Sequence, residues 1–293
     1  VEEMDQLPHA ASLQVNLQTH TPPRWARHRS SAQVSVECMP HPLPTSDYID
    51  LVRHSDVGLF LYDRRRYFAR CSGVLVEMLS SGVPVIVPAG SWLAAQIAAE
   101  NQRWLADVAA RFGEDDAPQW DAEHRTADVS WPRGAGQALL EFELASAAPP
   151  TQLQAVQAVV RQSTTPATSS EIEIVEGDGR LLRMLVTRKN EASSLGWEVR
   201  PAFDAPMPSL VHTRVRFLPT EDAGLIPQGA VGIAFGTYSA IPGKLREIVD
   251  HHRHYRREAR RYAEAWRLDA SADVIVARLA ERDDAAAYRT AVA

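Results

Sequence analysis

The sequence has little cysteine, and that scarcity limits the kinds of stabilising site it can form. Cys38 and Cys71 are its only cysteines. Two cysteines are too few for a disulfide framework or for a zinc site with four cysteine ligands. A reducing compartment is the simpler interpretation, so we expect a cytoplasmic location.

The sequence also lacks long apolar runs and any excess of positive charge. Its longest apolar run, at about 83–89, is far too short to span a bilayer, and the N-terminus has no basic-then-apolar secretory pattern. The formal net charge is -6, which provides no basic field for nucleic acid or anionic lipid. We therefore expect no transmembrane segment and no nucleic-acid partner. The first residue is Val1 rather than Met, as in a fragment of a longer reading frame.

What is present is typical of a folded protein with a sizeable core. Hydrophobic residues make up 45% of the 293 residues and charged residues 23%. A chain of this length favours two domains of ordinary size over one large domain.

The N-terminal third alternates between the periodicities of strands and helices. The pattern predicts strands at 13–17 and 34–36, a helix from Thr45, a buried strand at 57–62, a helix from Ser72 to Gly82, a strand at 83–87 and a helix at 92–105. Strands that alternate with single helices are typical of βαβ units and a parallel sheet.

The pattern changes at about residue 113, where turn-rich sequence separates segments with a period of two. These segments lie at 138–144, 153–160, 171–175, 181–187, 197–200 and 211–218, and they predict an antiparallel sandwich or barrel. A short strand at 231–235 and one long helix from Pro242 to about Trp266 follow. We therefore predict an α/β protein in which a Rossmann-like domain (1–113 and 229–293) is interrupted by an inserted antiparallel β-sandwich (114–228).

The candidate site lies where the strand at 57–62 leads into the helix that begins at Ser72. Ligands of open parallel sheets bind beyond the carboxyl ends of the strands. Backbone N–H groups at the helix start favour an anion such as a diphosphate, and a glycine permits its close approach. Arg64, Arg65 and Arg66 add positive charge, and the other predicted donor-binding residues are Tyr62, Arg70, Ser72, Gly73, Val74 and Glu77.

Each of these residues also has a simpler interpretation. Ser72 and Gly73 are suited to capping the helix, which needs the same backbone geometry. The run Arg64–Arg66 suits a solvated loop, and Glu77 suits a solvated helix face. The sequence contains no GxGxxG or Walker loop, so a nucleotide would be held by the helix end rather than by a glycine-rich cradle.

Two stretches, YIDLVRHSDVGLFLYD from Tyr48 and YFARCSGVLVEMLSSGVPVIVPAGSW up to Trp92, resemble a known family. They are similar in order and spacing to the C-terminal domain of GT-B glycosyltransferases of family 4, also called group 1. The tail at 232–266 is also similar, so the resemblance covers roughly half of the chain. It implies a domain that binds a nucleotide-diphosphate sugar, usually without metal, with Glu77 holding the ribose.

The resemblance has one departure and one missing part. The first glutamate of the family's Glu-seven-residues-Glu motif would fall at Ala69, so its contact to the donor sugar is missing or supplied from elsewhere. An acceptor-binding half precedes this domain in the family, and this sequence does not contain it. We expect no metal or other cofactor, and the sequence identifies no catalytic residue.

The first hypothesis is therefore a glycosyltransferase of the hexosyltransferase kind, which transfers a sugar to an unknown acceptor in glycan or polysaccharide biosynthesis. The second is a non-catalytic scaffold that binds glycan or protein through a degenerate glycosyltransferase domain, which Ala69 and the insertion favour. A third is a sugar-phosphate-binding α/β enzyme such as an epimerase, whose His and acidic pairs the sequence does not show.

Overall fold

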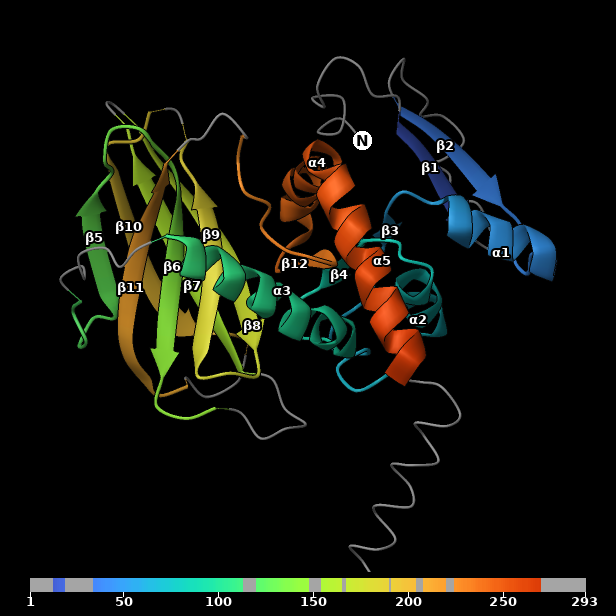
Figure 1. Ribbon diagram of the computed structural model, residues 1–293, viewed down its shortest axis with the longest axis horizontal. Coiled ribbons are helices and arrows are strands. Elements are labelled where there is room, and N and C mark those ends of the chain that lie inside the picture. The colour runs from blue at the N-terminus through green and yellow to red at the C-terminus, as the bar shows by residue number, and fades with distance from the viewer. Residues whose placement is uncertain are drawn as a thin grey trace, which may run out of the picture.

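The computed structural model describes residues 13–18, 34–112, 120–147, 154–164, 167–189, 191–203, 208–219 and 224–269. The protein is a mixed α/β structure with small parallel sheets, helices and two antiparallel sheets. Figure 1 shows the antiparallel strands on one side and the parallel sheets with most of the helices on the other. Within the described ranges, no helix is both long and apolar enough to cross a membrane.

Two parallel sheets form the first part. Strand β1 (Leu13–Gln18) pairs with β2 (Val34–Met39) in a sheet of its own. The second sheet has the order β12–β4–β3, with β4 (Val85–Pro88) between β3 (Gly58–Leu59) and β12 (Gly232–Phe235). The chain thus leaves this sheet after β4 and returns to it, past all the antiparallel strands, with β12. The exact division into domains stays a prediction.

The helices cover both faces of the sheet β12–β4–β3. They are α1 (Thr45–His54), α2 (Gly73–Ser80), α3 (Trp92–Arg111), α4 (Ile241–Asp250) and α5 (His252–Asp269), with a short 3-10 turn at Tyr238–Ala240. Val85 and Val87 share a buried cluster with α2 and α3, whereas Ile86 shares one with α4. We call this sheet and its helices the parallel region.

The strand predicted at 57–62 is shorter and less buried than expected. Only Gly58 and Leu59 pair with β4, and β3 lies at the edge of the sheet. Leu59 is 39% exposed and Leu61 is 55% exposed. Phe60 between them is buried, so one face of this segment is covered and the other is open to solvent, and the prediction of a strand buried on both faces is wrong here.

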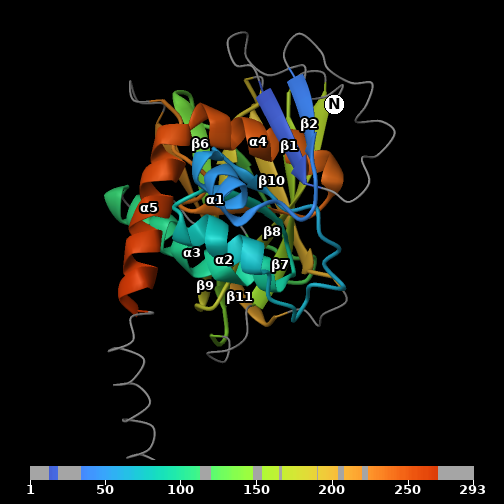
Figure 2. The same cartoon turned by 90° about the vertical axis from the view of Figure 1, so that its right-hand side faces the viewer.

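The single long helix predicted from Pro242 is in fact two helices. The backbone leaves helical geometry at His251, between α4 and α5. The break directs α5 across α2 (Figures 1 and 2), where Tyr262 joins the cluster of α2 and α3. Trp266, predicted on the apolar stripe, is 41% exposed.

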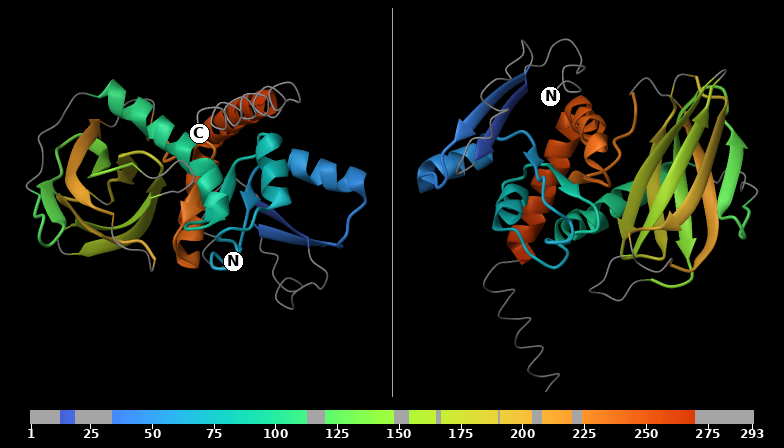
Figure 3. Two further views of the ribbon diagram at one scale, coloured as in Figure 1. Left: turned by 90° about the horizontal axis from the view of Figure 1, so that it is seen from below. Right: turned by 180° about the vertical axis from the view of Figure 1, so that it is seen from behind.

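The antiparallel region (126–219) consists of two sheets. Its strands are β5 (Thr126–Ser130), β6 (Ala135–Leu144), β7 (Gln154–Ser163), β8 (Thr168–Gly177), β9 (Leu181–Thr187), β10 (Ser194–Pro201) and β11 (Leu210–Pro219). The sheet orders are β5–β10–β7–β8 and β11–β6–β9. Figure 3 shows the antiparallel strands from two further sides. Both sheets contribute to one buried cluster around Phe142 and Trp197. The two sheets therefore share one core, and only β5 lacks a counterpart among the predicted strands.

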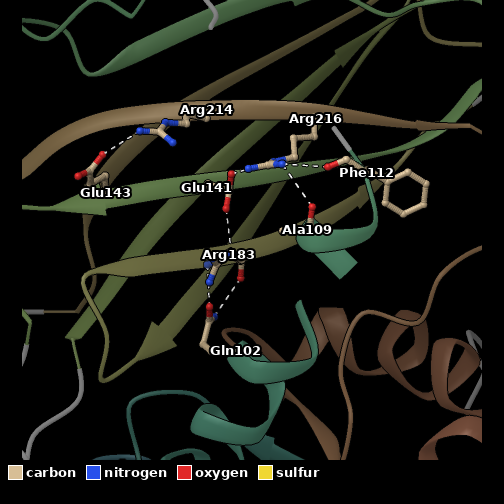
Figure 4. Close-up of polar contacts among 8 residues, drawn as sticks. All are labelled: Gln102, Ala109, Phe112, Glu141, Glu143, Arg183, Arg214 and Arg216. Atoms are coloured by element: carbon tan, nitrogen blue, oxygen red, sulfur yellow. Dashed lines mark hydrogen bonds and ion pairs between the residues drawn. The ribbon is translucent and has the colours of Figure 1, made fainter. Parts of the chain in front are cut away.

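Helix α3 joins the two regions. Leu93 and Ile97 in its first half pack in the cluster of β4, whereas Leu105 and Val108 pack against Leu139 and other residues of the antiparallel region. Polar contacts reinforce this junction (Figure 4). The Gln102 side chain on α3 accepts a hydrogen bond from the backbone N of Arg183 (2.8 Å) and donates to its carbonyl (3.0 Å).

Candidate functional site

The start of α2 is capped but not obstructed. Ser72 is buried, and its hydroxyl oxygen accepts a hydrogen bond from the backbone N of Leu75 (3.3 Å). The N–H groups of Gly73 and Val74 belong to the first turn and have no partner within the helix. A Cβ built at Gly73 would meet no atom within 4 Å. Capping by Ser72 therefore leaves two amides open to an anion.

The arginines of the loop before α2 carry unneutralised charge. Arg65, Arg66 and Arg70 are exposed. Among the residues that the structure describes, no carboxylate forms an ion pair with any of these three or with Arg64. This part of the surface therefore attracts anions.

Glu77 is exposed on α2 and accepts a hydrogen bond from the Tyr48 hydroxyl on α1. Burial raises the pKa of the Tyr48 phenol above its ordinary value, and the neighbouring Glu77 raises it further. Tyr48 therefore stays protonated and donates a hydrogen bond to the carboxylate. The sequence predicted a helix from Thr45 but not this contact.

Tyr62 belongs to the same group of side chains. Its ring stacks on Tyr67 with a centroid distance of 4.2 Å and meets the edge of Phe60 at 5.5 Å. Tyr62 also contributes to the raised pKa of Tyr48, so the two phenols lie near each other. The structure thus gathers Tyr62 and Glu77 around Tyr48, and it places Ser72, Gly73 and Val74 one helical turn before Glu77. Arg70 lies just before that turn and is not tied to this group by any described ion pair.

One loop follows each of the strands β3, β4 and β12, and we call these three loops the carboxyl edge. The antiparallel region contacts all three. After β3, the guanidinium carbon of Arg64 lies 4.1 Å from the ring centroid of Phe203. After β4, a Cβ built at Gly90 would lie 2.3 Å from Phe203, and after β12, one built at Gly236 would lie 3.1 Å from Ile174. Tertiary packing alone brings Phe203 and Ile174 to this edge.

Glu176 makes the polar contact of this interface. Its Oε1 accepts a hydrogen bond from the backbone N of Gly90 (2.7 Å). Burial raises the pKa of the Glu176 carboxyl to about 7, and the Gly90 N–H opposes that rise only in part. Gly90 and Glu176 are 86 residues apart in the sequence, so no local sequence pattern predicts this contact.

Within the described part of the chain, no three His, Cys, Asp or Glu side chains gather as a metal-binding group. The carboxyl edge and the start of α2 therefore offer a ligand backbone N–H groups, arginines, aromatic rings and the exposed carboxylates of Asp63 and Glu77. No protein-family model matches this sequence, and no curated protein matches it.

Proposed function

We propose that the chain is the donor-binding half of a GT-B glycosyltransferase, a Rossmann-like domain interrupted by an inserted antiparallel β-sandwich. The resemblance over Tyr48–Trp92 motivates this proposal. The small parallel sheet supports it, since α2 follows β3 at the edge where such sheets bind ligands. The return of the chain to β4 through β12 supports the interruption.

The observation that carries the proposal is the pairing of Glu77 with Tyr48 one turn after an open helix start. The diphosphate of a nucleotide sugar would accept hydrogen bonds from the N–H groups of Gly73 and Val74 and from Arg70. The ribose hydroxyls would donate to Glu77, whose carboxylate is held in place by Tyr48. Two ends of one ligand are thus recognised by a single helix.

In the proposed reaction, the bond between the anomeric carbon and the nucleoside diphosphate breaks while the oxygen of an acceptor hydroxyl bonds to that carbon, and the hydroxyl proton passes to the leaving diphosphate. The leaving diphosphate takes the electron pair, and amides and arginines stabilise its charge without a metal. Ala69 has no group to contact the donor sugar, so that contact would come from another residue. The acceptor would be held by a partner half, as in the family.

Calorimetry with UDP-, GDP- and ADP-sugars tests this proposal. We expect the full chain to bind one donor class, and Glu77→Gln to weaken it by about tenfold to a hundredfold, the value of a hydrogen bond to a charged group. Glutamine keeps an acceptor for Tyr48, so the fold is retained. Asp107→Asn, at an exposed position on α3, is the matched control and should bind as the wild type does. Equal binding by Glu77→Gln would refute the assigned role of Glu77.

A second candidate is a non-catalytic scaffold, which Phe203 favours because its ring already lies on the Gly90 turn of the carboxyl edge. A scaffold would bind no nucleotide sugar, yet it would retain a glycan or protein partner. A glycan array probed with the full chain and with Glu77→Gln separates the two candidates. Glycan binding that is equal in both, together with silence toward every donor, would favour the scaffold.

A further inference from the structure

The hydrogen bond between Gly90 and Glu176 holds a turn of the carboxyl edge in place. Gly90 has a positive φ of 69° and lies between the central strand β4 and helix α3. Its N–H is bound by a carboxyl group from β8, in the other region of the molecule. Ligands of open α/β sheets bind at such turns, so this carboxyl controls part of the carboxyl edge.

The carboxyl group is poorly suited to carry a charge where it lies. Glu176 is only 9% exposed, and its Oε2 is buried without a hydrogen-bond partner among the described residues. It borders a cavity of about 90 Å³ between α3, β8, β9 and β12. An ionised carboxylate would have one N–H donor for two oxygens, which is costly in a buried site.

The charged groups around this cavity do not compensate Glu176, because each is engaged elsewhere. Arg183 pairs with Glu141 (2.8 Å), and Lys244 pairs with Glu173 (2.7 Å). Outside the cavity, Arg64 lies over the Phe203 ring. From α3, the neutral Gln102 amide donates to the backbone carbonyl of Glu176 (3.2 Å) rather than to its carboxyl group. The start of α3, which Ser91 caps, favours a negative charge, and burial outweighs it.

We propose that Glu176 is the switch of a pH-sensitive contact, which holds the antiparallel region on the Gly90 turn when protonated and releases that turn when ionised. The ring of Phe203, a non-glycine residue with a φ of 59°, packs against the Gly90 turn. Such backbone strain persists only while surrounding contacts hold it. Release therefore also removes the ring from Gly90 and frees Arg64. This inference goes beyond the proposed nucleotide-sugar site and holds whether or not that ligand binds.

Hydrogen exchange of the Gly90 amide, resolved by NMR, tests the switch. After correction for intrinsic exchange, we expect protection to fall about thirtyfold between about pH 5.5 and about pH 8.5, as the raised carboxyl pKa implies. Glu176→Gln keeps the acceptor for Gly90 and cannot ionise, so its protection should be high at both values. Glu171→Gln, an exposed change in the same strand, should behave as the wild type does.

Two outcomes would overturn the switch. One is constant protection in the wild type, as expected if water enters the cavity and hydrates the carboxylate while the turn stays bound. The other is an equal loss of protection in Glu176→Gln. If that variant does not fold, the wild type still decides the question. The midpoint of Glu176 ionisation, read from its carboxyl carbon shift, must coincide with the midpoint of the protection loss.

Discussion

The helix caps of the parallel region and the buried carboxylate of the antiparallel region depend on contacts over very different sequence distances. In the parallel region, the buried hydroxyls of Ser72 and Ser91 cap helices and bind amides three residues ahead. In the antiparallel region, Glu141 is buried between two arginines that lie 42 and 75 residues away in the sequence (Figure 4). Local chemistry thus specifies these caps, whereas the Glu141 ion pairs form only through tertiary contacts.

The largest expected effect comes from breaking the ion pairs of Glu141. Its side chain is 1% exposed and binds Arg183 (2.8 Å) and Arg216 (3.0 Å). Glu141→Ala removes the buried carboxylate that both half-buried arginines bind, which we expect to cost about 3 to 5 kcal/mol in the free energy of unfolding. Urea denaturation measures this loss.

The matched control is Glu143→Ala, two residues further along β6 and on the same face of that strand. Glu143 is 31% exposed and pairs with Arg214 and Arg180, so its loss should cost less than about 1 kcal/mol. Equal losses for the two variants would contradict the difference between the buried and exposed pairs.

The next effect tests whether α3 couples the two regions. Leu93→Ala in its first half and Leu105→Ala in its second half each truncate a buried side chain, at a cost of about 2 to 5 kcal/mol. Because α3 packs in both regions, each variant should shift one common unfolding transition, followed by fluorescence and by circular dichroism. Two separate transitions, with each variant moving only its own, would show that the regions unfold independently.

Stability should also depend on pH through Glu176. Its pKa is about 7 in the folded protein and about 4.5 unfolded, so the unfolded state loses its proton first as pH rises. The wild type should therefore lose stability relative to Glu176→Gln between about pH 4.5 and 7, and remain lower above that, by at most about 3 kcal/mol. Denaturation of both proteins across this range measures the difference. A difference that does not change with pH would contradict the raised pKa.

The smallest effect concerns the cap of α2. Ser72→Ala removes the hydroxyl that binds Leu75 and should cost about 1 kcal/mol, while Ser72→Asp should restore most of that loss. Thermal unfolding measures both variants. If Ser72→Asp lost as much stability as Ser72→Ala, the loss would come from the packing of the serine side chain and not from its capping hydrogen bond.

The sequence predicted most of the elements because their signals are local. The Ser72 cap, Gly82 with a positive φ of 70° and the period of two in β9 each depend on a few neighbouring residues. The predicted strand at 57–62 failed because an apolar run does not show whether a strand lies at an edge. The predicted single helix failed because its apolar stripe continues across the break at His251.

The sequence predicted only those residues of the candidate site that lie close together in the chain. Ser72, Gly73, Val74 and Glu77 follow from one helix and the loop before it. The contact of Tyr48 with Glu77 spans 29 residues, and that of Glu176 with Gly90 spans 86. No periodicity reports contacts of that range, since they arise only when the regions pack.

The central claim is that an anionic ligand binds the open start of α2 beside Glu77, and amide-resolved NMR during titration with nucleotide-diphosphate sugars tests it most directly. The account predicts saturable shifts that are largest at the Gly73 and Val74 amides and that weaken in Glu77→Gln. Shifts confined to the antiparallel region, or no shifts with any donor, would contradict it.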